Sequence, residues 1–76
     1  MTNLEALNVF ARKNMLDVES YIDDTVPSEI QICAVFDPED PMVFAYVAGD
    51  SLYYIDGDLV LHECTPEFLV DYDINA

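Results

Sequence analysis

The sequence predicts a single α+β domain in which an N-terminal helix packs on a four-stranded antiparallel β-meander. Residues 3–14 place apolar side chains at helical spacing. Residues 29–63 alternate short runs rich in Val, Ile, Tyr and Phe with clusters of Gly, Pro and Asp, which is typical of strands joined by tight turns. The chain has 76 residues, enough for one domain with a small core, so residues 1–76 are assigned to one acidic domain.

The predicted helix covers residues 3–14. Thr2 stands three residues before Glu5 in a capping-box pattern, which indicates where the helix begins. The apolar positions that follow at helical spacing are Leu4, Leu7, Phe10 and Ala11. Both basic residues of the chain fall in the last turn, where positive charge complements the carbonyl end of the helix dipole. Asn14 is expected to be the left-handed residue that terminates the helix.

Four extended runs are expected to form the meander. They are residues 30–36, 42–48, 52–55 and 59–62. Strand alternation predicts that the helix covers a face made by Ile30, Ile32, Ala34 and Phe36 of the first run and by Met42, Phe44, Tyr46 and Ala48 of the second. The opposite face is also apolar, at Cys33, Val35, Val43, Ala45 and Val47. That second face therefore needs cover from a second helix, from the C-terminal segment or from another chain.

Two segments admit more than one structure. Residues 15–27 fit either a short helix that begins at Asp17 or an edge strand that ends before residues 23–24, and we favour the helix. The Thr-Pro-Glu sequence of residues 65–67 predicts an N-cap followed by proline at the first helical position, and so a short C-terminal helical turn. The alternation in residues 71–76 would also suit a last strand, and both structures stay open.

The composition limits the class of protein. Hydrophobic residues make up 53% of the chain, which distinguishes it from acidic disordered tails and predicts that it folds. The N-terminus lacks the pattern of a secretory signal, and no apolar run approaches the roughly 18 residues of a membrane span. A cytoplasmic protein is expected, in the host cell cytoplasm if a phage encodes it. Cys33 and Cys64 are too few for a disulfide framework and are expected to be buried thiols.

No residue pattern predicts catalysis or metal binding. The three candidate zinc ligands His62, Cys64 and Cys33 lack the paired spacing of a zinc site, and the acidic clusters lack the order of an EF-type calcium loop. Aspartates that cap their own turns explain several of these clusters. The sequence contains neither a glycine-rich phosphate loop nor a basic stripe. We therefore expect no enzyme, no cofactor, no metal and no direct contact with nucleic acid or membrane.

The distribution of charge is the outlying property of the sequence. The net charge is −14, and residues 17–76 contain fifteen Asp or Glu and no Lys or Arg. These carboxylates cannot form local ion pairs with basic side chains, and their mutual repulsion opposes folding. The pattern predicts that another molecule supplies the countercharge. A solvated acidic surface that serves solubility, or the general acidity of a salt-loving organism, is the alternative explanation.

The amount of charge is comparable with that of DNA. Fifteen charges correspond to roughly 25 Å of duplex, and a globule of this length is about 30 Å across. Carboxylates two positions apart in an extended chain would lie about 6.7 Å from each other on one side of a strand, giving regular anionic rows. The pairs with this spacing are Asp17/Glu19, Asp37/Glu39, Asp56/Asp58 and Asp71/Asp73.

The predicted contact surface combines carboxylates with tyrosines. Tyr53 and Tyr54 point to opposite faces of one strand, so one ring is expected to be inward and the other exposed, and tyrosine is enriched in protein interfaces. The predicted partner-binding residues are Asp23, Asp24, Asp37, Glu39, Asp40, Asp56, Asp58, Asp71, Asp73, Tyr53 and Tyr54.

In overall character the chain resembles the phage DNA mimics, which are small, strongly acidic, poor in basic residues and carry aromatic side chains among Asp and Glu. These include anti-CRISPR proteins, anti-restriction proteins and the uracil-DNA glycosylase inhibitor, to whose opening residues Met1-Thr2-Asn3-Leu4 are similar. The resemblance covers the whole chain in composition and assigns no roles residue by residue. It implies an inhibitor that occupies the positively charged nucleic-acid groove of a host defence complex, foremost a CRISPR effector.

Two other functions stay open at this point. An immunity or antitoxin protein would cover the basic site of a cognate nuclease, and a nuclease gene directly adjacent would favour it. An acidic structural or assembly subunit would associate through the second apolar face of the sheet, and a stable homo-oligomer would favour that function.

Overall fold

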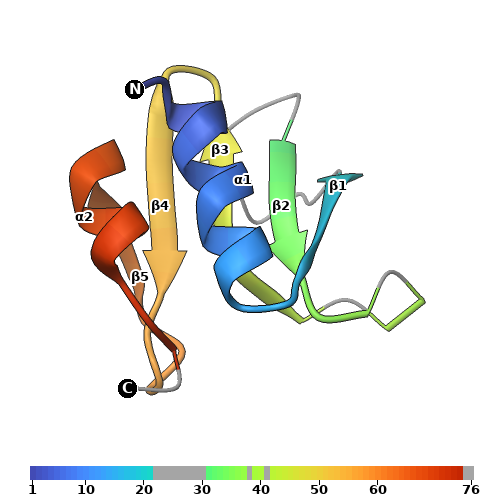
Figure 1. Ribbon diagram of the computed structural model, residues 1–76. Coiled ribbons are helices and arrows are strands. Elements are labelled where there is room, and N and C mark those ends of the chain that lie inside the picture. Colours follow the sequence, from blue (N-terminus) through green and yellow to red (C-terminus); the bar gives the residue numbers. More distant parts are fainter. Residues whose placement is uncertain (22–30, 38, 41, 75–76) are drawn as a thin grey trace.

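The computed structural model describes residues 1–21, 31–37, 39–40 and 42–74, and this part of the chain forms two helices and five strands (Figure 1). The elements are α1 (Asn3–Lys13), β1 (Asp17–Tyr21), β2 (Gln31–Val35), β3 (Val43–Ala48), β4 (Ser51–Ile55), β5 (Leu61–Cys64) and α2 (Pro66–Asp71). The strands form one open antiparallel sheet in sequence order. The α+β class with an N-terminal helix on an antiparallel sheet is confirmed, whereas the expected number of four strands is wrong.

The additional strand is β1, which lies in the segment for which we favoured a helix. Asp17 pairs with Val35 and Tyr21 pairs with Gln31, so β1 is the edge strand beside β2. A helix beginning at Asp17 is therefore wrong, and the edge-strand alternative is correct for Asp17–Tyr21. The physical reason is that β2 is a buried strand, and pairing on both of its sides satisfies backbone N–H and C=O groups that water cannot reach.

The helix α1 begins at the predicted capping box. The Oγ1 atom of Thr2 accepts the N–H of Glu5 at 3.1 Å, and the Glu5 carboxylate accepts the N–H of Thr2 at 3.1 Å. The hydrogen bond from the backbone N–H of Thr2, with a smaller contribution from the Thr2 side chain, lowers the pKa of Glu5. Two of the backbone donors that a helix leaves unpaired at its start are thereby satisfied.

The C-terminus of α1 ends in a Schellman-type turn that differs from the prediction. The N–H of Leu16 donates to the carbonyl of Ala11 at 2.8 Å, which is the long hydrogen bond of this motif. The left-handed residue is Met15, with φ 59°, whereas Asn14 has φ −104°. The expectation that Asn14 is left-handed is therefore wrong. The side-chain amide of Asn14 donates to the carbonyl of Phe10 at 2.9 Å, so Asn14 still belongs to the last turn of the helix.

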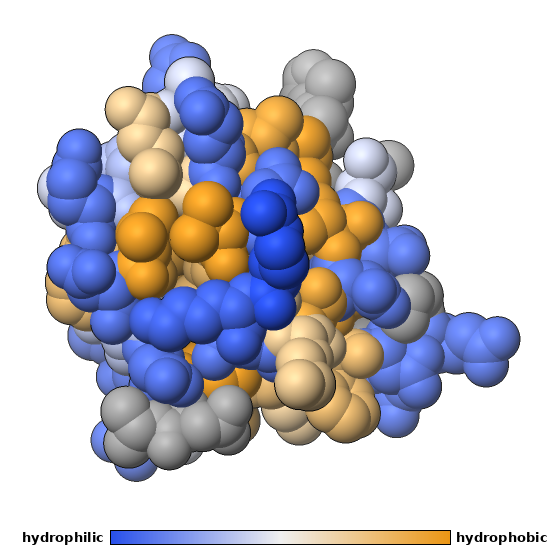
Figure 2. Space-filling view, in the orientation of Figure 1, coloured by the Kyte–Doolittle hydropathy of each residue, from blue (hydrophilic) through white to orange (hydrophobic). Residues whose placement is uncertain are grey.

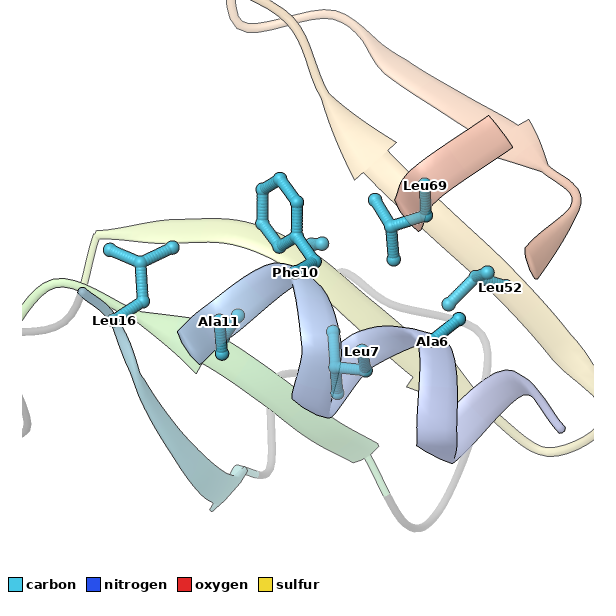
Figure 3. Packing of buried hydrophobic residues seen from close by; sticks show 9 residues of the cluster. Ala6, Leu7, Phe10, Ala11, Leu16, Leu52 and Leu69 are labelled. Carbon is cyan, nitrogen blue, oxygen red and sulfur yellow. The ribbon is translucent and has the colours of Figure 1, made fainter. Parts of the chain in front are cut away.

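The core lies between the two helices and one face of the sheet, and Figure 3 shows side chains of α1 pointing into this layer. Its buried members are Ala6, Leu7, Phe10 and Ala11 of α1, Leu16, Ala34 of β2, Ala45 of β3, Leu52 of β4 and Leu69 of α2. Complete burial of a side chain such as Phe10 or Leu7 stabilises the fold by about 1.5–3 kcal/mol. Thr65 caps α2 by accepting the N–H of Phe68 at 3.2 Å, which confirms the predicted helical turn for Pro66–Asp71. The alternative of a last strand is wrong for residues 72–74, which belong to no strand, and residues 75–76 lie outside the described residues.

A bulge in β3 changes which side chains face the helices. Ala34 pairs with Ala45 and Val35 pairs with Val43, so Phe44 is an extra residue with no partner on β2. Beyond the bulge the alternation is shifted by one position. The expectation of a continuous alternating face from residue 42 to residue 48 is therefore wrong.

The shift exchanges the two faces along most of β3. Ala45 and Val47, which we expected on the far face, pack with Phe44 in the core under the helices. Tyr46 and Ala48, which we expected under the helices, are buried on the opposite face. The prediction for β3 is correct for Phe44, which packs under the helices, and for Val43, which packs on the opposite face.

The opposite face holds a second buried cluster, made by Cys33, Val35, Tyr46 and Ala48. Because α2 packs beside α1 on the first face, the second helix does not cover this cluster (Figure 1). Phe36 and Met42, which we expected to be inward, are 70% and 58% exposed. Both lie outside β2 and β3, in the connection between them, where strand alternation no longer applies.

Candidate functional site

One end of the sheet gathers most of the described carboxylates. Because the sheet is antiparallel, the β2–β3 and β4–β5 connections lie at the same end, where α1 ends and β1 begins (Figure 1). The C-terminal part of α2 also reaches this end, since the Nζ atom of Lys13 in α1 donates to the carbonyl of Val70 at 3.3 Å. The carboxylates here, which we call the acidic end, are Asp17, Asp37, Glu39, Asp40, Asp56, Asp58, Asp71 and Asp73.

The acidic end unites seven of the nine carboxylates that the sequence predicted as partner contacts. The other two, Asp23 and Asp24, lie outside the described residues. Asp17 was absent from the predicted set, although a strand that begins at this residue would have placed it here. The described carboxylates elsewhere are Glu5, Glu19, Asp50, Glu63 and Glu67, on strands or toward the opposite end.

The two predicted tyrosines lie within β4, and Tyr54 borders the acidic end through its contact with Tyr72. Their rings lie on opposite faces of the strand, as predicted. Tyr53 stacks on Tyr46 with ring centroids 4.8 Å apart, and Tyr54 stacks on His62 at 5.0 Å and lies 4.9 Å from Tyr72. The expectation of one inward and one exposed ring is wrong, because both are half-buried in these aromatic contacts.

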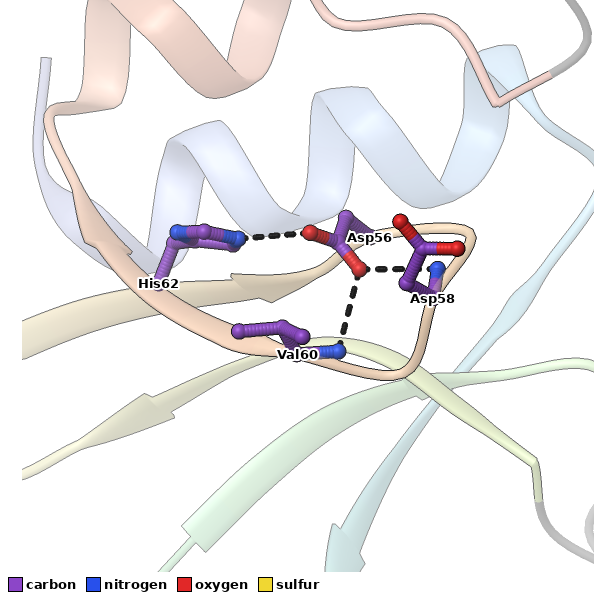
Figure 4. Close-up of polar contacts among 4 residues, drawn as sticks. All are labelled: Asp56, Asp58, Val60 and His62. Atoms are coloured by element: carbon purple, nitrogen blue, oxygen red, sulfur yellow. Dashed lines mark hydrogen bonds and ion pairs between the residues drawn. The ribbon is translucent and has the colours of Figure 1, made fainter.

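The loop between β4 and β5 is organised by the carboxylate of Asp56 (Figure 4). One oxygen accepts the N–H of Asp58 at 2.9 Å and the N–H of Val60 at 3.0 Å. The other oxygen lies 2.7 Å from Nε2 of His62. The hydrogen bond from His62, followed by that from Val60, lowers the pKa of Asp56. Asp56 is therefore already engaged within the fold, while Asp58 projects into solvent.

The expected rows of carboxylates form at only one place. Asp17 and Glu19 lie two apart in β1, but Asp37 accepts the N–H of Glu39 at 3.0 Å, which makes a turn rather than a strand. Asp56 accepts the N–H of Asp58 in a similar turn in the β4–β5 loop. Asp71 and Asp73 are not in a strand either, because Asp71 is the last residue of α2. The carboxylates are gathered by turns and element ends, which concentrates them without regular spacing.

The basic residues do not neutralise the acidic end. Within the described residues, Arg12 forms no ion pair with a carboxylate, and Lys13 donates to a backbone carbonyl instead. In the same part of the chain, the one close contact between a carboxylate and a basic side chain joins Asp56 and His62, and it is an ion pair only when the imidazole is protonated. Eight carboxylates and two basic residues leave a formal excess of six negative charges at this end.

The thiols and the histidine offer no reactive centre. Cys33 and Cys64 are not joined by a disulfide. Burial, with a smaller contribution from the charge of Glu63, raises the pKa of Cys64 to about 11, so this thiol is not activated as a nucleophile. Across residues 1–21, 31–37, 39–40 and 42–74, no group of three or more His, Cys, Asp or Glu side chains is placed to hold a metal ion.

No helix in the described part of the chain is long and apolar enough to span a bilayer. No protein-family model, curated protein or solved structure matches this chain. Function must therefore be inferred from the chain's own surface. The acidic end can attract and orient a positively charged partner, and no catalytic arrangement accompanies it among the described residues.

Proposed function

We propose that this protein is a DNA mimic that inhibits a host nucleic-acid-binding defence complex, foremost a CRISPR effector, by occupying its positively charged groove. The observation that supports this function is the acidic end, where eight carboxylates gather while neither Arg12 nor Lys13 forms an ion pair with a carboxylate of the described residues. Charges arranged in this way act at long range, so they accelerate encounter with a Lys/Arg-lined cleft and favour it over neutral surfaces.

The size of the molecule supports the same function. Its principal extents are 30 × 26 × 22 Å, and its net charge is −14. Duplex DNA carries one charge per about 1.7 Å, so a duplex segment as long as the molecule carries about 18 charges. A groove built to hold a duplex would therefore meet a similar charge over a similar length.

The uneven placement of the charge favours a binding role over solubility. Solubility requires only net charge, and spreading that charge evenly would reduce repulsion between neighbouring carboxylates. Assembly through the second apolar face is disfavoured, because Cys33, Val35, Tyr46 and Ala48 are at most 7% exposed in the single chain. An immunity protein would use the same acidic surface against a nuclease, and the identity of the partner separates it from the proposed inhibitor.

The proposal is tested by measuring whether CRISPR effectors and nucleases lose binding to fluorescent target DNA when the protein is added. The informative variant carries Glu39→Gln, Asp40→Asn, Asp58→Asn and Asp71→Asn at the acidic end. We expect inhibition by the unmodified protein that weakens as salt rises, and at least a tenfold loss of potency in this variant, since each phosphate-like contact contributes to a strongly salt-dependent affinity.

A matched control removes the same four charges elsewhere, through substitution of Glu19, Asp50, Glu63 and Glu67. Inhibition should persist in this control, because the acidic end is intact. If the acidic-end variant inhibits as strongly as the unmodified protein, the charges at that end do not carry the function and the assignment fails.

A further inference from the structure

The acidic end also contains an apolar groove. It lies between the β2–β3 and β4–β5 connections, has a volume of about 490 Å³ and is lined by Phe36, Asp40, Met42, Val43, Ile55 and Leu59. Phe36, Met42 and Leu59 are 70%, 58% and 78% exposed. Large apolar side chains that gather on a surface, instead of occurring singly, mark sites of interaction. The volume falls within the range of about 300–1,000 Å³ that is typical of ligand-binding clefts.

Leu59 is held in this groove in an unfavourable backbone conformation. Its φ is 64°, in the left-handed region that Gly and Asn adopt more easily than a leucine. The loop imposes this conformation, because the N–H of Leu59 donates to the carbonyl of Asp56 at 3.0 Å and the N–H of Asp56 donates to the carbonyl of Val60 at 3.1 Å. A large apolar side chain therefore stands where neither the backbone nor the solvent favours it, which points to a role in binding.

The surroundings of the groove are acidic. Asp40 lines it, Asp37 follows Phe36 in the chain, and Asp58 precedes Leu59. Figure 2 shows the face that carries the helices, where apolar surface lies between hydrophilic side chains, whereas Val43 of the groove packs on the opposite face of the sheet. An apolar centre with a polar rim is the usual anatomy of a protein interface. The negative charge of this rim favours a positively charged partner.

We infer that the groove binds one apolar side chain from a partner protein segment in which Lys or Arg residues flank that side chain. The inference rests on the proposed function and specifies its partner contact: the acidic rim pairs with the basic residues, while the groove buries the side chain between them. The affinity for the partner then depends on a buried apolar side chain as well as on charge. A protein that mimicked DNA through its charge alone would not need such a side chain.

Two fluorescent peptides test this inference with the full-length protein. One has the sequence Lys-Arg-Lys-Phe-Lys-Arg-Lys, and the other has serine in place of phenylalanine. At an ionic strength of about 0.1 M, where the Debye length is about 10 Å, we expect the phenylalanine peptide to bind at least about tenfold more tightly by anisotropy. Its binding should also shift the methyl NMR signals of Met42 and Ile55, while the serine peptide should not.

Leu59→Asn should remove the preference, because it deletes the apolar wall while suiting the left-handed conformation, so the variant is expected to fold. Met15→Asn is the matched control. Met15 is also exposed and left-handed but does not line the groove, so the preference should persist. Equal affinity for the two peptides, or no binding of either, would overturn the inference.

The two proposals fail in different ways. Equal affinity for the two peptides together with salt-sensitive inhibition would contradict binding in the groove but would still support the DNA-mimic function. A clear preference for the phenylalanine peptide without inhibition of any nucleic-acid-binding complex would support the groove and contradict the proposed function.

Discussion

The Nε2 atom of His62 lies 2.7 Å from Oδ2 of Asp56, so a side chain of β5 holds the loop that leaves β4. The second carboxylate oxygen accepts the N–H groups of Asp58 and Val60. One carboxylate thus closes the loop that supplies both Asp58 and Leu59 to the acidic end. The shape of this part of the surface depends on the ionised form of Asp56.

Replacing Asp56 with Asn is expected to reduce the free energy of unfolding in a pH-dependent way. Because the folded-state pKa of Asp56 is lowered, its carboxylate contributes stability above the ordinary pKa of 3.8, and this contribution is lost as the pH falls through the lower folded-state value. Urea denaturation should therefore show a clear loss for Asp56→Asn near neutral pH and a smaller loss in strong acid. Asp58→Asn is the control, because the Asp58 carboxylate accepts none of the loop's hydrogen bonds from described residues. An equal loss at both pH values would contradict a role for the charge.

Met15→Gly is expected to stabilise the protein. Met15 is 91% exposed and has φ 59°, so its side chain contributes little contact while the left-handed conformation costs about 1 kcal/mol or more for a residue with a Cβ atom. For a domain of this size the melting temperature should rise by roughly 4–8 °C per kcal/mol. Gly49→Ala is the opposite test: Gly49 has φ 60° and an added Cβ would meet no atom within 4 Å, so only the backbone conformation opposes it. A lower melting temperature for Met15→Gly would mean that the methionine side chain makes contacts that its exposure conceals.

Added salt should raise the stability of the protein and lower its affinity for a basic partner. The principal extents are 30 × 26 × 22 Å, comparable with the Debye length of about 30 Å at 0.01 M salt, so all carboxylates repel one another there. At 1 M salt the Debye length is about 3 Å and this repulsion is screened. Thermal unfolding and partner binding measured over the same salt series should change in opposite directions. Stability that does not change with salt would show that the acidic end is not under repulsive strain.

Cys64 should react slowly with iodoacetamide. Its pKa is raised to about 11, mainly by burial, so the reactive thiolate is scarce at neutral pH. The alkylation rate, followed by mass spectrometry of the Cys64 peptide, should still be rising about tenfold per pH unit at pH 9, whereas an ordinary thiol levels off near its pKa of about 8.5. A rate that levels off near that ordinary pKa would show that Cys64 is not desolvated.

Features that depend on neighbouring residues could be predicted from the sequence. The capping box of Thr2 and Glu5 and the Thr65-Pro66 start of α2 each involve a few adjacent positions, and both are present as predicted. The carboxylates of the two acidic turns were also identified, because aspartate in turns caps its own backbone within two or three residues.

Features that depend on distant residues were either missed or kept only as the less favoured alternative. The strand state of Asp17–Tyr21 depends on pairing with β2, and the bulge at Phe44 depends on the register between β2 and β3. The exposed apolar groove was missed for the same reason, since Phe36 and Leu59 continue apolar runs in the sequence and only the positions of the two connections place them outside the core.

The sequence by itself determined the charge, the start of each helix and the presence of an antiparallel sheet, since composition, capping and strand patterns act over short distances along the chain. Only the tertiary structure decided that seven predicted carboxylates meet at one end beside an apolar groove. The reason is that antiparallel pairing brings alternate connections to the same end of a sheet, and that pairing is chosen by burial of the whole core rather than by any local segment.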